Sequence, residues 1–115
     1  GMLICFESVF PYISRDRVRN GAQVLVQATS DQTYDGTPNP KQHADLCVLR
    51  AIETRRYFVR AGATGLSQMI DAGGRVLQNI PTGKAGVIVD EFVCRSGKTF
   101  FVRYGDWFVW VCVNV

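Results

Sequence analysis

Two side chains near the N-terminus have the chemistry of a reactive site. In the stretch LICFES, the thiol of Cys5 ends an apolar run, and the carboxylate of Glu7 follows two residues later. A thiol with a charged neighbour could act as a nucleophile in covalent catalysis. Cysteine is also among the residues most often buried, so Cys5 could instead fill the core while Glu7 begins a solvated loop. These six residues alone favour the packing interpretation.

The other residues with reactive side chains show no pattern of a metal centre. The four cysteines, Cys5, Cys47, Cys94 and Cys112, lie far apart, and no Cys-x-x-Cys pair occurs. We therefore expect no metal site, and the sequence indicates no cofactor. Cys47, Cys94 and Cys112 are interpreted as packing residues, although an oxidising compartment would allow a disulfide between the last two. The single histidine, His43, is interpreted as a local hydrogen-bonding group.

Composition places the chain among globular proteins of one-domain size. It has 115 residues, of which 47% are hydrophobic and 20% charged, with a formal net charge of +3. Its thirteen Lys and Arg residues form no long basic stripe, so we expect no nucleic-acid partner. Residues 107–115 are almost wholly apolar but too few to span a bilayer. They could form a buried last strand or the first turns of a membrane helix.

The positions of these residues depend on a strand–helix–strand pattern in the first thirty residues. Residues 3–6 are predicted to form a short buried strand and residues 22–29 a second one. Between them, Pro11 suits the first turn of a helix that we expect to end at Arg19, before Asn20 and Gly21. Two strands joined by a helix at this spacing predict a parallel pair.

A second helix is predicted after the turn-rich loop 30–40. Asn39 is a candidate N-cap, Pro40 suits the first helical position, and Gln42 completes a capping-box pattern. Apolar residues at helical spacing include Cys47, and Arg50 and Glu53 are spaced for a local ion pair worth a few tenths of a kcal/mol. We expect this pair to brace the sheet rather than take part in chemistry.

The second half of the sequence is predicted to be rich in β-structure. Residues 57–65 and 66–80 are expected as strands, with a hairpin at Ala72, Gly73 and Gly74. Residues 85–94 are expected as another strand, followed by a turn at 95–98 and the stretch 99–108. The fold class predicted from these patterns is a single mixed α/β unit.

The ordered motifs ICFE, GAQVLV, QH, RAIE, RAGATGLSQMID and RYGDWFVW resemble the C-terminal half of a carbon–nitrogen hydrolase (nitrilase superfamily) domain. Within that superfamily the chain is most similar to the apolipoprotein N-acyltransferases of bacterial inner membranes. The resemblance implies half of a four-layer α-β-β-α sandwich over residues 1–107. Residues 108–115 would then begin an apolar segment that is cut short and could be transmembrane, with the domain on the periplasmic face.

The resemblance also implies roles for individual residues and reverses the first interpretation of Cys5. Cys5 corresponds to the family's nucleophile and Glu7 to the acidic residue two positions later. If both lay on the strand, the period of two would place them on one side. The backbone N–H of Phe6 corresponds to an oxyanion donor. The loop after the second strand, with Asp31, Thr33 and Tyr34, would bind substrate, although capping is an alternative role for Asp31.

The implied reaction transfers a phospholipid acyl chain through a cysteine thioester to the N-terminal amine of a lipoprotein. The family's Glu base and Lys belong to the first half of the domain, so we expect this chain alone to be inactive. The chain also departs from the family at three places: residues 30–36 lack the usual Asn-Asp-x-Trp motif, residues 60–65 lack an Asn, and Phe6 replaces a common Tyr. These departures put acyl-chain and acceptor specificity in doubt.

Two alternative functions remain open from the sequence. The chain could be half of a soluble amidase or nitrilase that acts on small C–N bonds, or a stand-alone remnant of the fold without catalysis. In each case half a sandwich would leave strand edges and an apolar face uncovered. We therefore expect a homo-oligomer.

Overall fold

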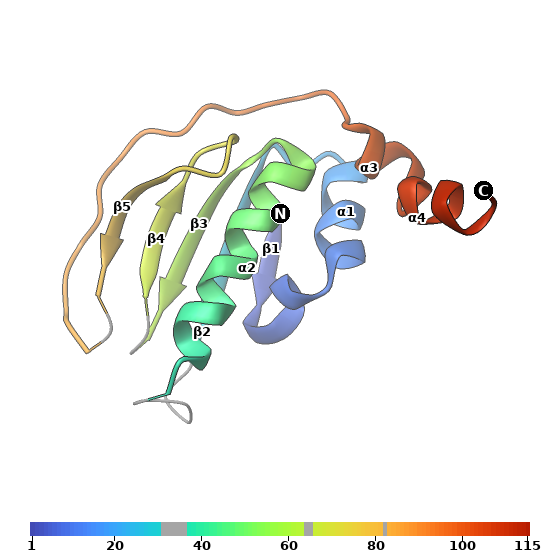
Figure 1. Cartoon of the computed structure of the whole chain (residues 1–115). Helices are drawn as coiled ribbons and strands as arrows, with labels where there is room; N and C mark the ends of the chain where they lie inside the picture. The colour runs from blue at the N-terminus through green and yellow to red at the C-terminus, as the bar shows by residue number, and fades with distance from the viewer. Residues whose placement is uncertain (31–36, 64–65, 82) are drawn as a thin grey trace.

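The computed structural model of the chain describes residues 1–30, 37–63, 66–81 and 83–115. It contains a five-stranded mixed sheet with helices (Figure 1). The elements are β1 (Met2–Ile4), the 3₁₀-helix η1 (Cys5–Val9), α1 (Pro11–Arg19), β2 (Val24–Thr29), α2 (Asn39–Thr54), β3 (Tyr57–Gly62), β4 (Ser67–Ile70), β5 (Val76–Ile80), α3 (Phe100–Tyr104) and α4 (Trp107–Val113). The predicted mixed α/β class is confirmed.

The strand order follows the sequence from β1 to β5. The first three strands are parallel, with Met2 opposite Val26 and Val24 opposite Tyr57, so the predicted parallel pair is confirmed. β4 and β5 then run antiparallel, joined at the predicted hairpin. There the carboxylate of Asp71 accepts from the N–H groups of Gly73 and Arg75 at 2.9 and 2.8 Å.

The core lies between the sheet and the helices α1 and α2, which cover one face (Figure 1). Alternation along β1 shows the two faces: Leu3 is fully buried, whereas Met2 and Ile4 are each 53% exposed. The buried apolar cluster is Leu3, Val18, Leu25, Cys47, Ala51, Phe58, Ile70 and Val102. The described chain therefore forms one helix layer and one sheet layer, with the opposite face of β1 open.

The strand expected over residues 85–94 is absent from the described structure. This segment has no regular structure and runs beside β5 before it crosses to α3 (Figure 1). Val87 and Val89 are 86% and 84% exposed, so these apolar residues, whose pattern suggested a strand, make little contact with the rest of the protein. A strand needs a hydrogen-bonded neighbour, and among the described strands β5 pairs only with β4.

The stretch expected to continue as β-structure is helical. The hydroxyl of Thr99 accepts from the N–H of Val102 at 3.1 Å and caps α3, and Gly105 ends that helix at a φ of +66°. The apolar tail forms α4, so of the two structures considered for it, the buried strand is wrong. Across the described ranges every helix is too short or too polar to span a membrane.

Two predicted boundaries need correction. β1 ends at Ile4, so Cys5 and Phe6 belong to η1 rather than to the strand. α2 begins at Asn39, with Pro38 in the N-cap position and without a side-chain cap, so the predicted capping box is wrong. The N–H of Asn39 instead donates to the hydroxyl oxygen of Thr37 at 3.3 Å. Pro40, at the second helical position, has no N–H, so one fewer donor at the helix start needs a cap.

The hairpin between β4 and β5 depends on a glycine. Gly74 has a φ of +88°, and an added Cβ would lie 2.6 Å from Ile52 on α2. Gly21 has a φ of +104° with open space around it. We expect Gly21→Ala to lower the free energy of unfolding by about 1 kcal/mol through backbone strain. Gly74→Ala should lower it by about 2 kcal/mol or more, because the clash with Ile52 adds to the strain. Urea unfolding of both variants measures this; equal losses would contradict the packing of the hairpin on α2.

Candidate active site

Cys5 lies where β1 changes into a tight 3₁₀ turn. Its φ is +53°, a left-handed conformation that non-glycine residues rarely adopt, and its side chain is half-buried. Residues held in this region cost on the order of 1–3 kcal/mol and persist only where the surroundings fix them. Nucleophiles on sharp strand-to-helix turns are known to have such strain. The site therefore requires contacts that hold the turn.

Glu7 is held against the backbone of the same turn. Its carboxylate accepts from the N–H of Ile4 at 3.2 Å and lies 3.7 Å from the guanidinium of Arg17 on α1. Both side chains of the ion pair are more than one third exposed, so the pair itself contributes little. Cys5 and Glu7 both lie in η1, beyond the end of β1, so the alternation of a strand does not apply to them. The expectation that strand alternation places them on one side is wrong.

Gln27 on β2 connects the turn to the buried side of the sheet. Its fully buried amide N–H₂ group donates to the carbonyl oxygen of Cys5 at 2.7 Å and to the hydroxyl of Ser8 at 2.6 Å. Its carbonyl oxygen accepts from Arg60 at 2.8 Å and from the thiol of Cys47 at 3.2 Å. All the hydrogen-bonding capacity of this amide is thus used inside the core.

Cys47 and His43 have structural partners in the same network. Cys47 is buried as predicted, and burial raises the pKa of its thiol above the ordinary value. The packing role predicted for Cys94 and Cys112 is wrong, because both are exposed. His43 is 3% exposed, and its Nε2 lies 3.1 Å from the hydroxyl of Ser8, which fits the predicted hydrogen-bonding group. Its ring also stacks on Phe6, with centroids 5.0 Å apart. α2 therefore supports both the buried and the exposed side of the Cys5 turn.

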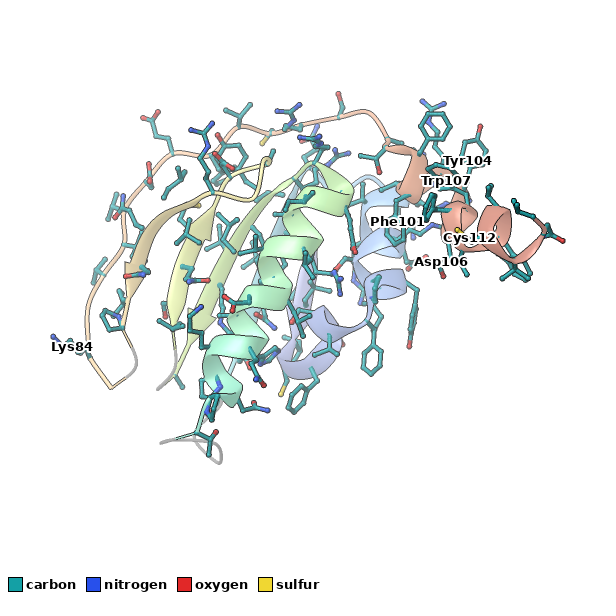
Figure 2. All side chains as sticks on the ribbon, in the orientation of Figure 1. Lys84, Phe101, Tyr104, Asp106, Trp107 and Cys112 are labelled. Atoms are coloured by element: carbon teal, nitrogen blue, oxygen red, sulfur yellow. The ribbon has the colours of Figure 1, made fainter. Side chains whose placement is uncertain are left out.

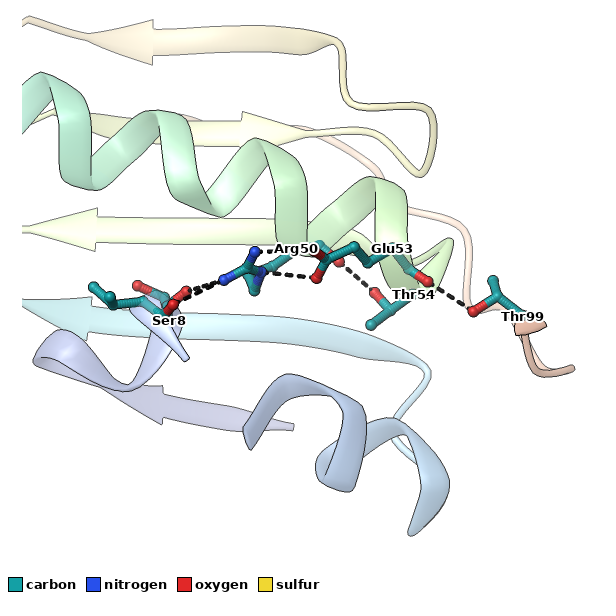
Figure 3. Close-up of polar contacts among 6 residues, drawn as sticks. Ser8, Arg50, Glu53, Thr54 and Thr99 are labelled. Atoms are coloured by element: carbon teal, nitrogen blue, oxygen red, sulfur yellow. Dashed lines mark hydrogen bonds and ion pairs between the residues drawn. The ribbon is translucent and has the colours of Figure 1, made fainter. Parts of the chain in front are cut away.

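Arg50 is the second side chain, after Gln27, that holds the turn at residues 5–9. Its guanidinium donates to the carbonyl oxygens of Ser8 at 3.1 Å and Val9 at 3.0 Å (Figure 3). The predicted ion pair with Glu53 is confirmed, with N–O distances of 2.9 and 3.0 Å. The Arg50 side chain is only 4% exposed. The pair therefore differs from the surface pair that the spacing suggested, because it fixes a buried arginine against three acceptors.

The same ion pair lies on a path of contacts that reaches the C-terminal helices. The carbonyl oxygen of Glu53 accepts from the hydroxyl of Thr99, the cap of α3, at 2.7 Å (Figure 3). Thr54 donates to the carbonyl oxygen of Arg50 at 2.7 Å. Sequence reasoning missed Gln27 and the role of Arg50 in holding the turn. The available signal was a polar residue at a buried strand position and an arginine on the apolar side of a helix.

Part of the predicted site lies outside the described residues. Asp31, Thr33 and Tyr34 belong to 31–36, so their placement relative to Cys5 remains a prediction. Among the described residues, no group of three or more His, Cys, Asp or Glu side chains could hold a metal ion.

A family model described as Carbon-nitrogen hydrolase matches residues 1–95, which include the turn at residues 5–9 and Arg50. The chain belongs to the carbon–nitrogen hydrolase family. It is 40% identical over 113 residues to the apolipoprotein N-acyltransferase of Geobacter metallireducens, covering 98% of this chain and 22% of that protein. It is 38% identical over 110 residues to the enzyme of the same name from Thermotoga maritima, covering 96% and 22%.

Solved structures of this superfamily share the fold. Nit3 of Saccharomyces cerevisiae has a TM-score of 0.63 at 21% identity, over 74% of this chain and 34% of that chain. The NitFhit protein of C. elegans has a TM-score of 0.63 at 27% identity, over 71% of this chain and 22% of that chain. The nitrilase-like fold expected from the motifs is therefore confirmed. The chain spans about a fifth of the length of the curated relatives it matches.

Removal of the Arg50 guanidinium is expected to lower the free energy of unfolding far more than removal of an exposed ion pair. Arg50→Met leaves the carbonyl oxygens of Ser8 and Val9 and the Glu53 carboxylate without their buried donor, which should cost about 3 kcal/mol. Lys41→Met is the control, because it breaks an exposed pair with Asp45 on the same helix and should cost no more than about 0.5 kcal/mol. Urea unfolding compares the two; similar losses would show that the Arg50 guanidinium contributes little.

Proposed function

We propose that this chain is the nucleophile-bearing part of a membrane acyltransferase. In this function Cys5 takes an acyl chain from a phospholipid and passes it to the N-terminal amine of a lipoprotein. The observation that carries the proposal is the strained turn at Cys5, held by Gln27 and Arg50, in a chain whose curated relatives are named apolipoprotein N-acyltransferase. Strained residues of this kind cluster at functional sites, which supports the proposal.

The proposed chemistry has two steps. In the first, the Cys5 thiolate attacks the ester carbonyl carbon of the phospholipid, a C–S bond forms, and the C–O bond breaks to release a lysophospholipid that takes up a proton. In the second, the amine of the acceptor attacks the thioester, a C–N bond forms, the C–S bond breaks, and the amine proton returns to the sulfur. Two moderate barriers replace one high barrier.

The roles proposed for neighbouring residues follow from their contacts. The N–H of Phe6 would donate to the tetrahedral oxyanion next to the sulfur. Glu7 would act mainly by holding the turn, because its carboxylate is bonded to the N–H of Ile4 and faces Arg17. Asp31, Thr33 and Tyr34 are proposed to line the substrate side of the site.

We also propose that catalysis needs the part of the parent domain that contains the family's Glu and Lys. The thiolate rather than the thiol is the nucleophile, so without a base to take up the proton of Cys5 the first step would be slow. That part would also cover the open face of β1; for the isolated chain a homo-oligomer stays a prediction. The parent would sit in a bacterial inner membrane, with residues 1–107 on the periplasmic face and residues 108–115 starting an apolar segment.

The test uses a chimera in which this chain replaces the matching segment of the Geobacter metallireducens relative. Incubated with a phospholipid in detergent micelles and no acceptor, the chimera should gain one acyl group on Cys5, located by peptide mass spectrometry. Cys5→Ala should abolish both the adduct and transfer to a lipopeptide amine. Cys94→Ala, which removes an exposed thiol outside the site, should leave both intact.

Two results would contradict the proposal. One is transfer by the Cys5→Ala chimera at the rate of the unmodified chimera. The other is acylation of Cys5 in the isolated 115-residue chain as fast as in the chimera, which would show that no further base is needed.

A further inference from the structure

A basic hollow lies at the end of the molecule away from Cys5. Arg55, at the C-terminus of α2, and Arg95 and Lys98, in the turn before α3, are exposed and line a hollow of about 190 Å³. Its other lining residues are Arg56, Ser96, Gly97 and Thr99, and none of the lining residues has a carboxylate. Positive charge here is thus not neutralised by an acidic side chain within the hollow.

The hollow is held in place by backbone contacts of a buried arginine. Arg56 donates to the carbonyl oxygens of Ala22 at 2.9 Å and Gly97 at 2.6 Å, which ties the turn to the start of β2. The N–H of Arg95 also donates to the carbonyl oxygen of Gln23 at 3.3 Å. Burial, and then the nearby charge of Arg95, lower the pKa of Arg56. A bound anion would reduce the repulsion between these cations.

An exposed aromatic surface begins directly after the hollow. Phe100, Tyr104 and Trp107 are 69%, 61% and 42% exposed. The ring centroid of Phe100 lies 5.6 Å from that of Tyr104 and 5.9 Å from that of Trp107. Figure 2 shows Tyr104 and Trp107 near the start of α4. α4 continues this surface with further exposed apolar residues. Tyrosine and tryptophan are enriched where a membrane meets water, because their rings have an apolar body and a polar end.

α3 is fixed to the body of the protein rather than free to move alone. The guanidinium of Arg15 on α1 donates to the carbonyl oxygen of Phe101 at 2.9 Å, and Thr99 is bonded to α2 through Glu53. Between residues 92 and 115 the only acidic side chain is Asp106, against the three cations Arg95, Lys98 and Arg103. A basic hollow and an aromatic surface therefore adjoin on one rigid end of the molecule.

We propose that Arg55, Arg95 and Lys98 bind the phosphate of an anionic phospholipid headgroup, while the adjoining aromatic rings rest in the membrane interface. Arginine and lysine are the side chains that recognise phosphate, and basic segments bind anionic bilayers. The exposed apolar residues of α4 follow directly after these rings, which suits contact with the same membrane interface. The proposal rests on the membrane location in the proposed function, but not on the thiol chemistry.

This headgroup site is distinct from the site at Cys5. Cys5 follows the C-terminal end of β1, whereas the hollow adjoins the N-terminal end of the parallel strand β2. The six residues of β2 extend about 20 Å between these two ends. The site would therefore hold the protein on the bilayer and would not present a lipid ester to the thiol.

Vesicle binding of the 115-residue protein tests the proposal. Trp107 and Trp110 are the only tryptophans in the sequence, so their fluorescence reports contact of α4 with lipid. Phosphatidylcholine vesicles with phosphatidylglycerol should bind the protein and shift this fluorescence to shorter wavelength, and added salt should weaken binding. Each cation near a membrane surface contributes about fivefold in affinity, so Arg55→Gln/Lys98→Gln should bind about 25-fold more weakly.

The matched control is Lys41→Gln/Lys84→Gln, which removes two exposed cations elsewhere; Lys84 lies far from α3 and α4 (Figure 2). It should bind as the unmodified protein does, as should Cys5→Ala, so failure here is separable from failure of the acyl chemistry.

Equal weakening by both double variants, or no loss in either, would overturn the proposal. Tight binding of inorganic phosphate that fully displaces the protein from vesicles at constant ionic strength would also overturn it, in favour of a free-anion site. Circular dichroism checks that the variants are folded.

Discussion

The turn from Cys5 to Val9 depends on two buried donors that hold its carbonyl oxygens. Gln27 binds the oxygen of Cys5, and Arg50 binds those of Ser8 and Val9. A buried backbone oxygen without a partner costs about 1–3 kcal/mol, so three satisfied oxygens can offset the strain of a left-handed residue. This constraint explains why the core beside Cys5 is polar rather than apolar.

The polar core restricts how the rest of the chain can pack. Gln27, Arg50 and Arg60 occupy positions on β2, α2 and β3 that a simpler α/β protein would fill with aliphatic side chains, and each is at most 3% exposed. Such groups are tolerated only when their hydrogen bonds are made, so the strands and α2 have little freedom to shift. Through Glu53 and Thr99 the same set of contacts also fixes the cap of α3. The turn at Cys5 and the C-terminal helices are therefore held by one connected group of residues.

The sequence predicts the elements whose pattern is local. The parallel unit of β1, α1 and β2, the helix α2 and the β4–β5 hairpin follow from apolar spacing and from glycines at turns. The strand expected at 85–94 fails because its alternation says nothing about a partner, and here Val87 and Val89 face solvent. The turn at Cys5 could not be predicted either, because its left-handed residue is not a glycine and the donors that hold it come from positions 27 and 50.

The central claim is that Gln27 and Arg50 impose the conformation of Cys5, and the φ of Cys5 measures it directly. Three-bond coupling constants about this angle, from the amide proton to the α-proton and from the α-proton to the preceding carbonyl carbon, would report its sign by NMR in the unmodified protein and in Gln27→Leu. We expect a positive φ in the unmodified protein and a substantial population with negative φ in the variant, because the carbonyl oxygen of Cys5 loses its donor. A negative φ in both proteins, or a positive φ that survives unchanged in Gln27→Leu, would contradict the account.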